Sequence, residues 1–150
     1  SWGSEMCIRD RLGADNIAVS GPGLSEELGE ISARGFQLVI DATGIPGVVE
    51  QAFRFVRNDG TLLLFGVCPE DSEIKLNPYE IFRRDIRIVG SFALRKTFQA
   101  AIALMEGNII DVAPLIGEIV PLDALPDAVE RMAQGKTNMK VIIKPGGRHQ

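Results

Sequence analysis

Apolar residues along the chain follow two patterns that alternate with each other. Short apolar runs at residues 36–41 and 61–65 flank a segment in which apolar residues recur at helical spacing. That segment begins at Pro46, and its buried stripe is predicted to contain Val49, Ala52, Phe53 and Val56. This order predicts a strand, a crossover helix and a parallel strand.

The alternation continues on both sides of this unit. Further strands are predicted at residues 17–19, 86–92, 116–121 and 140–145, and helices at 24–31, 77–84, 98–105 and 125–132. Strands and helices that alternate with short connections predict an α/β fold with a mainly parallel sheet covered on both faces. Such a sheet normally needs more strands than these, so we expect part of a doubly wound, Rossmann-like sheet that is truncated at its N-terminal side.

Two glycine-bearing segments are turn or loop signals. Asn58, Asp59 and Gly60 predict a turn before the strand at 61–65. Gly21-Pro22-Gly23 is interpreted as a surface loop, because its spacing does not match a dinucleotide-binding turn.

Composition and charge narrow the class of protein. The chain has 150 residues, of which 45% are hydrophobic and 24% charged, as in a globular domain with a substantial core. A net charge of −4 gives no sign of the positive charge that binds nucleic acid or an anionic membrane. No apolar run approaches the roughly 20 residues that cross a bilayer, and residues 1–11 do not form a signal peptide. These features predict a cytoplasmic protein.

The metal-binding residue types are scarce. Cys7 and Cys68 lie far apart, and the single histidine is His149. A structural zinc site needs four Cys or His ligands and a catalytic site about three. We therefore expect no complete zinc site within this chain.

Several motifs in order resemble one family. They are Val-Ile-Asp-Ala-Thr-Gly at residues 39–44, the segments 52–57 and 59–66, residues 86–92, and the tail with Pro121-Leu122, Gly135-Lys136 and residues 140–143. Together they resemble the zinc-dependent medium-chain alcohol and polyol dehydrogenases over residues 12–145. The resemblance implies a partial dinucleotide-binding domain at 12–110 and a C-terminal segment at 111–150 that returns to the catalytic domain. Residues 1–11 have no periodicity and resemble translated adapter sequence, so we interpret them as a non-native junction, with a native helix end as the alternative.

The strand ends are the candidate site, because ligands of open parallel sheets bind outside the carboxyl ends of the strands. The resemblance implies that the backbone there holds the nicotinamide ring of NAD or NADP. It implies that Lys140 lies near the cofactor pyrophosphate. The strand-end positions are Ala42, Thr43, Gly44, Phe65, Gly66, Val67, Ser91, Phe92 and Ala93.

Some parts of the family pattern are not in this sequence. They are the Gly-x-Gly-x-x-Gly turn, the acidic residue that binds the adenosine ribose, and the catalytic zinc ligands. The chain is therefore expected to be the second half of an enzyme, with no catalytic residue of its own and with zinc bound by the intact parent. Ala93 stands where several polyol dehydrogenases have Arg, which argues against a sorbitol-type pocket.

Other polar residues receive structural interpretations. Asp41 is interpreted as a structural carboxylate rather than a general base, and Cys68 as a small residue near the cofactor. The cluster of Arg83, Arg84 and Arg87 is interpreted as a solvated charged edge.

Three functions remain open at this point. The first is part of an NAD(P)-dependent dehydrogenase that moves a hydride between a small secondary alcohol or polyol and nicotinamide. The second is a zinc-free quinone or enone reductase of the same superfamily, and the third a non-enzymatic doubly wound binding module. For the intact enzyme we expect a homodimer or homotetramer joined through residues 74–76 and the edge strand 86–92.

Overall fold

A computed structural model describes residues 12–92, 97–137 and 139–146 of the chain. The chain divides into two compact units. One unit is Ala18–Arg95, and the other combines Ser1–Ile17 with Lys96–Gln150. The predicted boundary near residue 110 stays a prediction.

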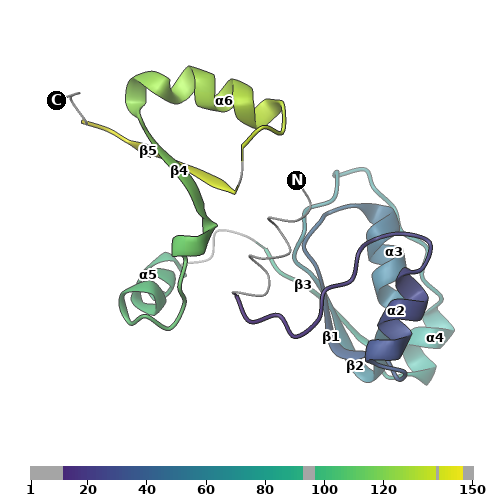
Figure 1. Cartoon of the computed structure of the whole chain (residues 1–150). Helices are drawn as coiled ribbons and strands as arrows, with labels where there is room; N and C mark the ends of the chain where they lie inside the picture. Colours follow the sequence, from purple (N-terminus) through teal and green to yellow (C-terminus); the bar gives the residue numbers. More distant parts are fainter. Residues whose placement is uncertain (1–11, 93–96, 138, 147–150) are drawn as a thin grey trace. The chain divides into compact units, whose positions relative to one another are not determined.

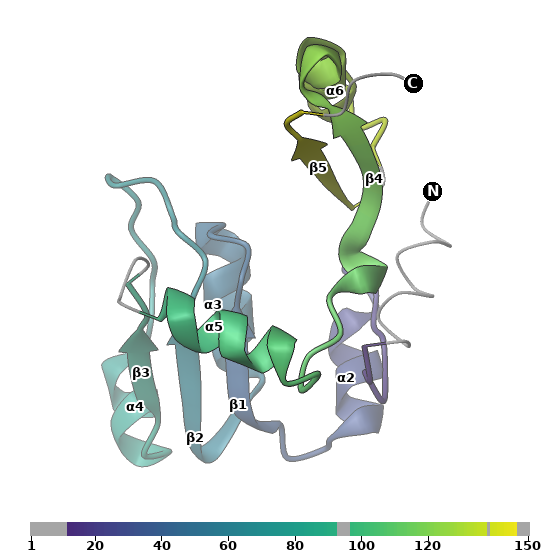
Figure 2. The same ribbon diagram turned by 90° about the vertical axis from the view of Figure 1, so that its left-hand side faces the viewer.

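The first unit is a parallel three-stranded sheet with helices (Figures 1 and 2). Strands β1 (Phe36–Asp41), β2 (Val56–Leu64) and β3 (Arg87–Gly90) lie in the order β1-β2-β3. Its helices are α2 (Leu24–Ile31), α3 (Pro46–Arg54) and α4 (Pro78–Arg83). The predicted α/β class with parallel strands is confirmed.

The core of this unit lies between α3, α4 and one face of the sheet. Val49 and Phe53 of α3 are buried, as the helical stripe predicts, and they pack with Val56, Leu62 and Ile86. Val56 already belongs to β2 but keeps its predicted place in the core, at 1% exposed.

The opposite face of the sheet is open within the unit. Leu38 and Ile40 alternate with Val39 along β1 and are each 52% exposed, and Val89 of β3 is 45% exposed. Among the described residues of this unit, helices therefore cover only one of the two sheet faces for which they are predicted.

The turn signal at Asn58-Asp59-Gly60 produces a bulge inside β2. Phe36 pairs with Val56, but Leu38 pairs with Thr61, so β2 carries extra residues between these two pairs. Asp59 has a φ of 59°, its amide donates to the Arg84 carbonyl oxygen (2.9 Å), and its own carbonyl oxygen accepts from the side chain of Gln37 (3.0 Å). These bonds hold the bulge between β1 and the end of α4.

One predicted strand is wrong. Residues 17–19 are not a strand, and none of the described strands pairs with them. A short apolar run forms a strand only where a neighbour completes its hydrogen bonds.

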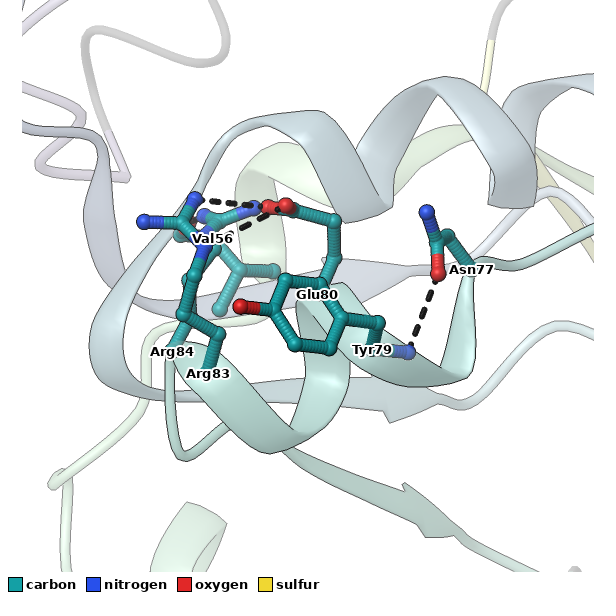
Figure 3. Close-up of polar contacts among 6 residues, drawn as sticks. All are labelled: Val56, Asn77, Tyr79, Glu80, Arg83 and Arg84. Atoms are coloured by element: carbon teal, nitrogen blue, oxygen red, sulfur yellow. Dashed lines mark hydrogen bonds and ion pairs between the residues drawn. The ribbon is translucent and has the colours of Figure 1, made fainter.

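The prediction of a solvated charged edge is wrong for Arg84. Its guanidinium donates to the Val56 carbonyl oxygen (Figure 3). It also lies 5.7 Å from the centre of the Phe53 ring. Arg83 instead forms an ion pair with Glu80 at 3.0 Å and keeps 55% of its side chain exposed. Asn77 is the N-cap of α4 at the predicted start of the helix, and its side chain accepts from the Tyr79 amide.

The second unit contains a parallel strand pair joined through a helix. β4 (Ile116–Pro121) pairs with β5 (Lys140–Lys144), and α6 (Leu125–Ala133) lies between them in sequence. Arg131 of α6 pairs with Glu118 of β4 at 2.7 Å and with Asp127 at 2.9 Å. The unit also has α5 (Phe98–Glu106), η1 (Ala113–Leu115) and η2 (Leu122–Ala124). Among the described residues of the chain, no helix is long and apolar enough to span a membrane.

Candidate cofactor-binding site

All three strands of the first unit end in the same row. Asp41 of β1 lies opposite Leu64 of β2, and Leu64 lies opposite Gly90 of β3. The amide of Ser91 donates to the Leu64 carbonyl oxygen at 3.0 Å, so pairing continues one step past β3. The segments that follow the three strands therefore leave the sheet at one edge.

A cavity of about 610 Å³ opens at this edge of the sheet. Its size is within the range of small-molecule sites, and most of its wall is apolar, with a few polar groups. The lining residues come from the strand ends, from α3 and from the segment before α4. They are Asp41, Val49, Leu64, Gly66, Val67, Cys68, Ser72, Ile74, Gly90, Ser91 and Phe92.

Asp41 connects the segments after β1 and β2. Its Oδ1 accepts from the Thr43 hydroxyl (2.6 Å) and the Thr43 amide (3.1 Å), and its Oδ2 accepts from the Gly44 amide (3.1 Å). Its backbone carbonyl oxygen accepts from the amides of Phe65 (2.9 Å) and Gly66 (2.7 Å). One residue thus holds both segments at the cavity.

The same hydrogen bonds set the charge state of Asp41. Its side chain is buried, with a residue exposure of 3%, and burial on its own raises the pKa of a carboxyl. The bonds from the Thr43 side chain and from the Thr43 and Gly44 amides outweigh burial, and the pKa of Asp41 lies below its ordinary value. The carboxylate is therefore ionised at neutral pH, and it suits a structural role better than that of a base.

Two glycines allow the backbones to approach this closely. Gly44 has a φ of 67°, and a Cβ there would lie 2.8 Å from the Val67 nitrogen. A Cβ on Gly66 would lie 2.7 Å from Oδ2 of Asp41 and 2.8 Å from the Thr43 nitrogen. Glycine at both positions is therefore needed for this close packing.

Several predicted site residues lie together at the cavity. Gly66, Val67, Ser91 and Phe92 line it, and the side chains of Val67 and Phe92 are strongly exposed, at 85% and 82%. The predicted residues of the first strand end do not line it but are held beside it through Asp41. These are Ala42, Thr43 and Gly44.

Two other predicted residues, Phe65 and Lys140, are not lining residues of the cavity. Phe65 is 60% exposed and is not a lining residue, and Ala93 lies outside the described residues. Lys140 is the exposed first residue of β5 in the second unit, where it pairs with Ile116. Its assignment to the pyrophosphate stays a prediction.

Besides Asp41, which is interpreted above as structural, five lining residues are not among the predicted site residues: Val49, Leu64, Ser72, Ile74 and Gly90. Val49 was placed in the core stripe of α3, and its position one turn into the helix after the first strand end is a signal that it borders the site. Ile74 belongs to a short alternating segment that also packs on the core, and nothing in the sequence marks Ser72. Cys68, which was expected near the cofactor, does line the cavity as a free thiol.

The residues present do not fit a zinc site. Within residues 12–92, 97–137 and 139–146, no three His, Cys, Asp or Glu side chains are grouped so that they could hold a metal ion. No chemical step through zinc is therefore assigned to these residues.

Comparisons with known proteins give a consistent match. The family model described as zinc-binding dehydrogenase matches residues 7–107. D-arabinitol dehydrogenase 1 of Uromyces fabae is 32% identical over 119 residues, which cover 79% of this chain and 34% of that protein. D-altritol 5-dehydrogenase of Agrobacterium fabrum is 33% identical over 138 residues, which cover 92% of this chain and 40% of that protein. The chain thus spans only about a third to two fifths of the length of these curated relatives.

The solved structures match in fold. A protein described as a zinc-binding dehydrogenase from Sinorhizobium meliloti 1021, bound to NADP, superposes with a TM-score of 0.76 at 23% identity. The match covers 93% of this chain and 42% of that one.

Proposed function

The chain belongs to the zinc-binding dehydrogenase family, and from this we propose that its strand-end cavity holds the nicotinamide ring of NAD or NADP. The ring, when bound, supplies the chemistry of hydride transfer. In this proposal the whole enzyme moves the hydride between that ring and a small secondary alcohol or its carbonyl form.

The position and lining of the cavity carry the proposal. It lies outside the carboxyl ends of three parallel strands, where α/β proteins bind nucleotide cofactors. Gly66 and Gly90 put two residues without side chains on its wall, so a flat ring could approach the backbone closely. The residues present therefore fit a nicotinamide group.

Each part of the wall has a different task in this proposal. Val49, Val67 and Ile74 provide apolar contact and exclude water from the ring. The hydroxyl groups of Ser72 and Ser91 are available to hydrogen-bond a carboxamide. Phe92 offers an exposed aromatic face at the mouth.

The substrate is proposed at the level of its class. The two curated relatives are named for D-arabinitol and D-altritol, which are open-chain polyols. This supports a polyol or a related secondary alcohol over the enone or quinone of the alternative reductase. It also favours an enzyme over a free-standing binding module.

A homodimer or homotetramer is proposed for the whole enzyme. β3 is the last strand in the described order β1-β2-β3, and its Ile88 and Val89 are 36% and 45% exposed. This favours strand pairing across a subunit boundary. Ile74 and Leu76, which were also expected there, pack partly against the core of their own unit. A change of Ile88 to Lys should reduce the sedimentation coefficient of the assembly, and an unchanged value would contradict this interface.

Binding of cofactor pieces tests the proposed function. Nicotinamide mononucleotide should shift the amide NMR signals of Gly66, Val67, Ser91 and Phe92, whereas adenosine monophosphate should leave them unchanged. The Val67→Asp variant should weaken NADH binding by about tenfold or more, because an apolar contact with the ring is lost and a charge takes its place.

A control variant makes the result specific. Phe82 is as exposed as Phe92, at 82%, but lies on α4 and does not line the cavity. Phe82→Asp should bind NADH as the wild type does. Equal loss in both variants, or ring-induced shifts confined to other residues, would contradict the site.

A further inference from the structure

We propose that Asp41 is a positioning residue for the cofactor pocket, which acts by holding the segments after β1 and β2 in one fixed arrangement. This inference rests on the proposed function for the identity of the ligand. It assigns to Asp41 an influence on cofactor affinity although no cofactor atom need touch its carboxylate.

The side chain and the backbone of Asp41 bind different segments. The carboxylate binds only the segment after β1, through Thr43 and Gly44, while the backbone carbonyl oxygen binds only the segment after β2, through Phe65 and Gly66. Asp41 therefore forms hydrogen bonds with both segments and links them to each other.

The network also reaches the helix that forms another wall. The Thr43 hydroxyl donates to Asp41 Oδ1 and accepts from the Ile45 amide at 3.2 Å. Ile45 is the N-cap residue of α3, and Val49 of that helix lines the cavity. Strand end, helix start and cavity wall are thus joined through one carboxylate.

This arrangement has little room for adjustment. Gly66 covers Oδ2 of Asp41 so closely that no Cβ fits between them, and Asp41 itself is 3% exposed. Water cannot replace a lost hydrogen bond at such a site without the segments moving apart. Movement of Gly66 would displace the lining residues Val67 and Cys68, which follow it in the chain.

The consequence is a pocket that is formed before the cofactor arrives. A site held in its binding shape loses less conformational entropy on binding than a site that must become ordered. Asp41 should therefore affect the dissociation constant of the cofactor through the order of the two segments.

The test compares variants that break this link with one that only weakens the core. Asp41→Asn removes the charge and turns one acceptor into a donor facing the Gly44 amide. Leu62→Ala removes a fully buried side chain of β2, 0% exposed, that does not line the cavity. Amide hydrogen exchange without ligand and NADH dissociation constants are measured on the purified whole enzyme, at a temperature where each variant is folded.

Asp41→Asn should speed exchange of the Thr43, Gly44, Phe65 and Gly66 amides and weaken NADH binding by about tenfold. Leu62→Ala should leave the dissociation constant within about twofold although it destabilises the fold. If Asp41→Asn does not fold, Thr43→Val is used, which removes only the hydroxyl link. It should weaken NADH binding about threefold. Thr43→Ser keeps the hydroxyl and should bind NADH as the wild type does.

The outcomes separate this inference from the function on which it rests. A folded Asp41→Asn protein, or failing that a Thr43→Val protein, with unchanged NADH affinity overturns the positioning role. So does a loss in Leu62→Ala equal to that in Asp41→Asn. If the wild type binds no NADH, the proposed function is overturned instead, and the exchange rates of the four amides decide whether Asp41 holds the two segments.

Discussion

Asp41 and Gly66 lock two strand ends together. The Gly66 amide donates to the Asp41 carbonyl oxygen at 2.7 Å, and a Cβ on Gly66 would lie 2.7 Å from the Asp41 carboxylate. The contact joins β1 to β2 at the row where both strands end. Both residues line the cavity, so the contact fixes part of the cavity wall as well as the edge of the sheet.

The Gly66→Ala variant should be clearly destabilised. Its methyl group would meet the Gly44 nitrogen and the Asp41 carboxylate, and such overpacking costs about 1–3 kcal/mol of unfolding free energy. Urea denaturation measures the change. Gly47→Ala in α3 is the matched control, because nothing lies within 4 Å of its added Cβ and alanine favours helix. Equal stability of Gly66→Ala and the wild type would contradict the close packing.

The stability that Asp41 contributes should depend on pH. Because its pKa is lowered in the folded protein, its contribution is fully present above the ordinary carboxyl pKa and is lost as pH falls through the lower folded value. The difference in unfolding free energy between wild type and Asp41→Asn should therefore be larger at neutral pH than in acid. Urea titrations across that range measure it. A difference that grows toward acid would contradict the sign of the shift.

Arg84 and Arg83 are neighbours with different expected effects. Arg84→Met loses the contact with the Phe53 ring and the bond to the Val56 carbonyl oxygen, at a cost of about 1–2 kcal/mol. Arg83→Met loses an ion pair with Glu80 that is largely exposed and screened by solvent, so it should cost much less than the loss of Arg84. Chemical denaturation of the two variants should rank them in this order, and the reverse order would show that Arg84 is solvated after all.

Lys140 and Lys144 offer a matched pair for the proposed pyrophosphate contact. Both are exposed residues of β5, four positions apart, and so lie on the same face of the strand. Lys140→Gln should weaken NADH binding about threefold to tenfold at low salt, since one charge contact to phosphate is lost, and Lys144→Gln should not. Isothermal titration at two salt concentrations tests this. Equal effects of the two changes would point to general charge attraction.

Local patterns allowed much of this fold to be predicted. β1 and β4 begin and end at the predicted residues, and α4 begins after Asn77, because apolar runs and helix-start residues act over a few positions. The strand predicted at 17–19 was wrong because strand formation depends on a neighbouring strand, which no local pattern reveals. The predicted solvation of Arg84 was wrong for a similar reason, since its partners Phe53 and Val56 are distant in sequence.

The candidate site was predictable in part. Strand ends that carry glycine marked Gly66 and Val67, and the resemblance added Ser91 and Phe92. Ser72 could not be found, because it lies in an irregular segment whose path is set by tertiary contacts. The link through Asp41 was also hidden, since the sequence marks a carboxylate at a strand end but not the amides that converge on it.

The interlocked glycines restrict how this pocket can be redesigned. Since neither Gly44 nor Gly66 can accept a side chain without displacing the backbone of the other segment, mutations that reshape the pocket must fall elsewhere on the wall. Val67, Ser91 and Phe92 line the pocket with exposed side chains and are therefore the adjustable positions. Libraries for altered cofactor or substrate preference should vary these three side chains and keep both glycines constant.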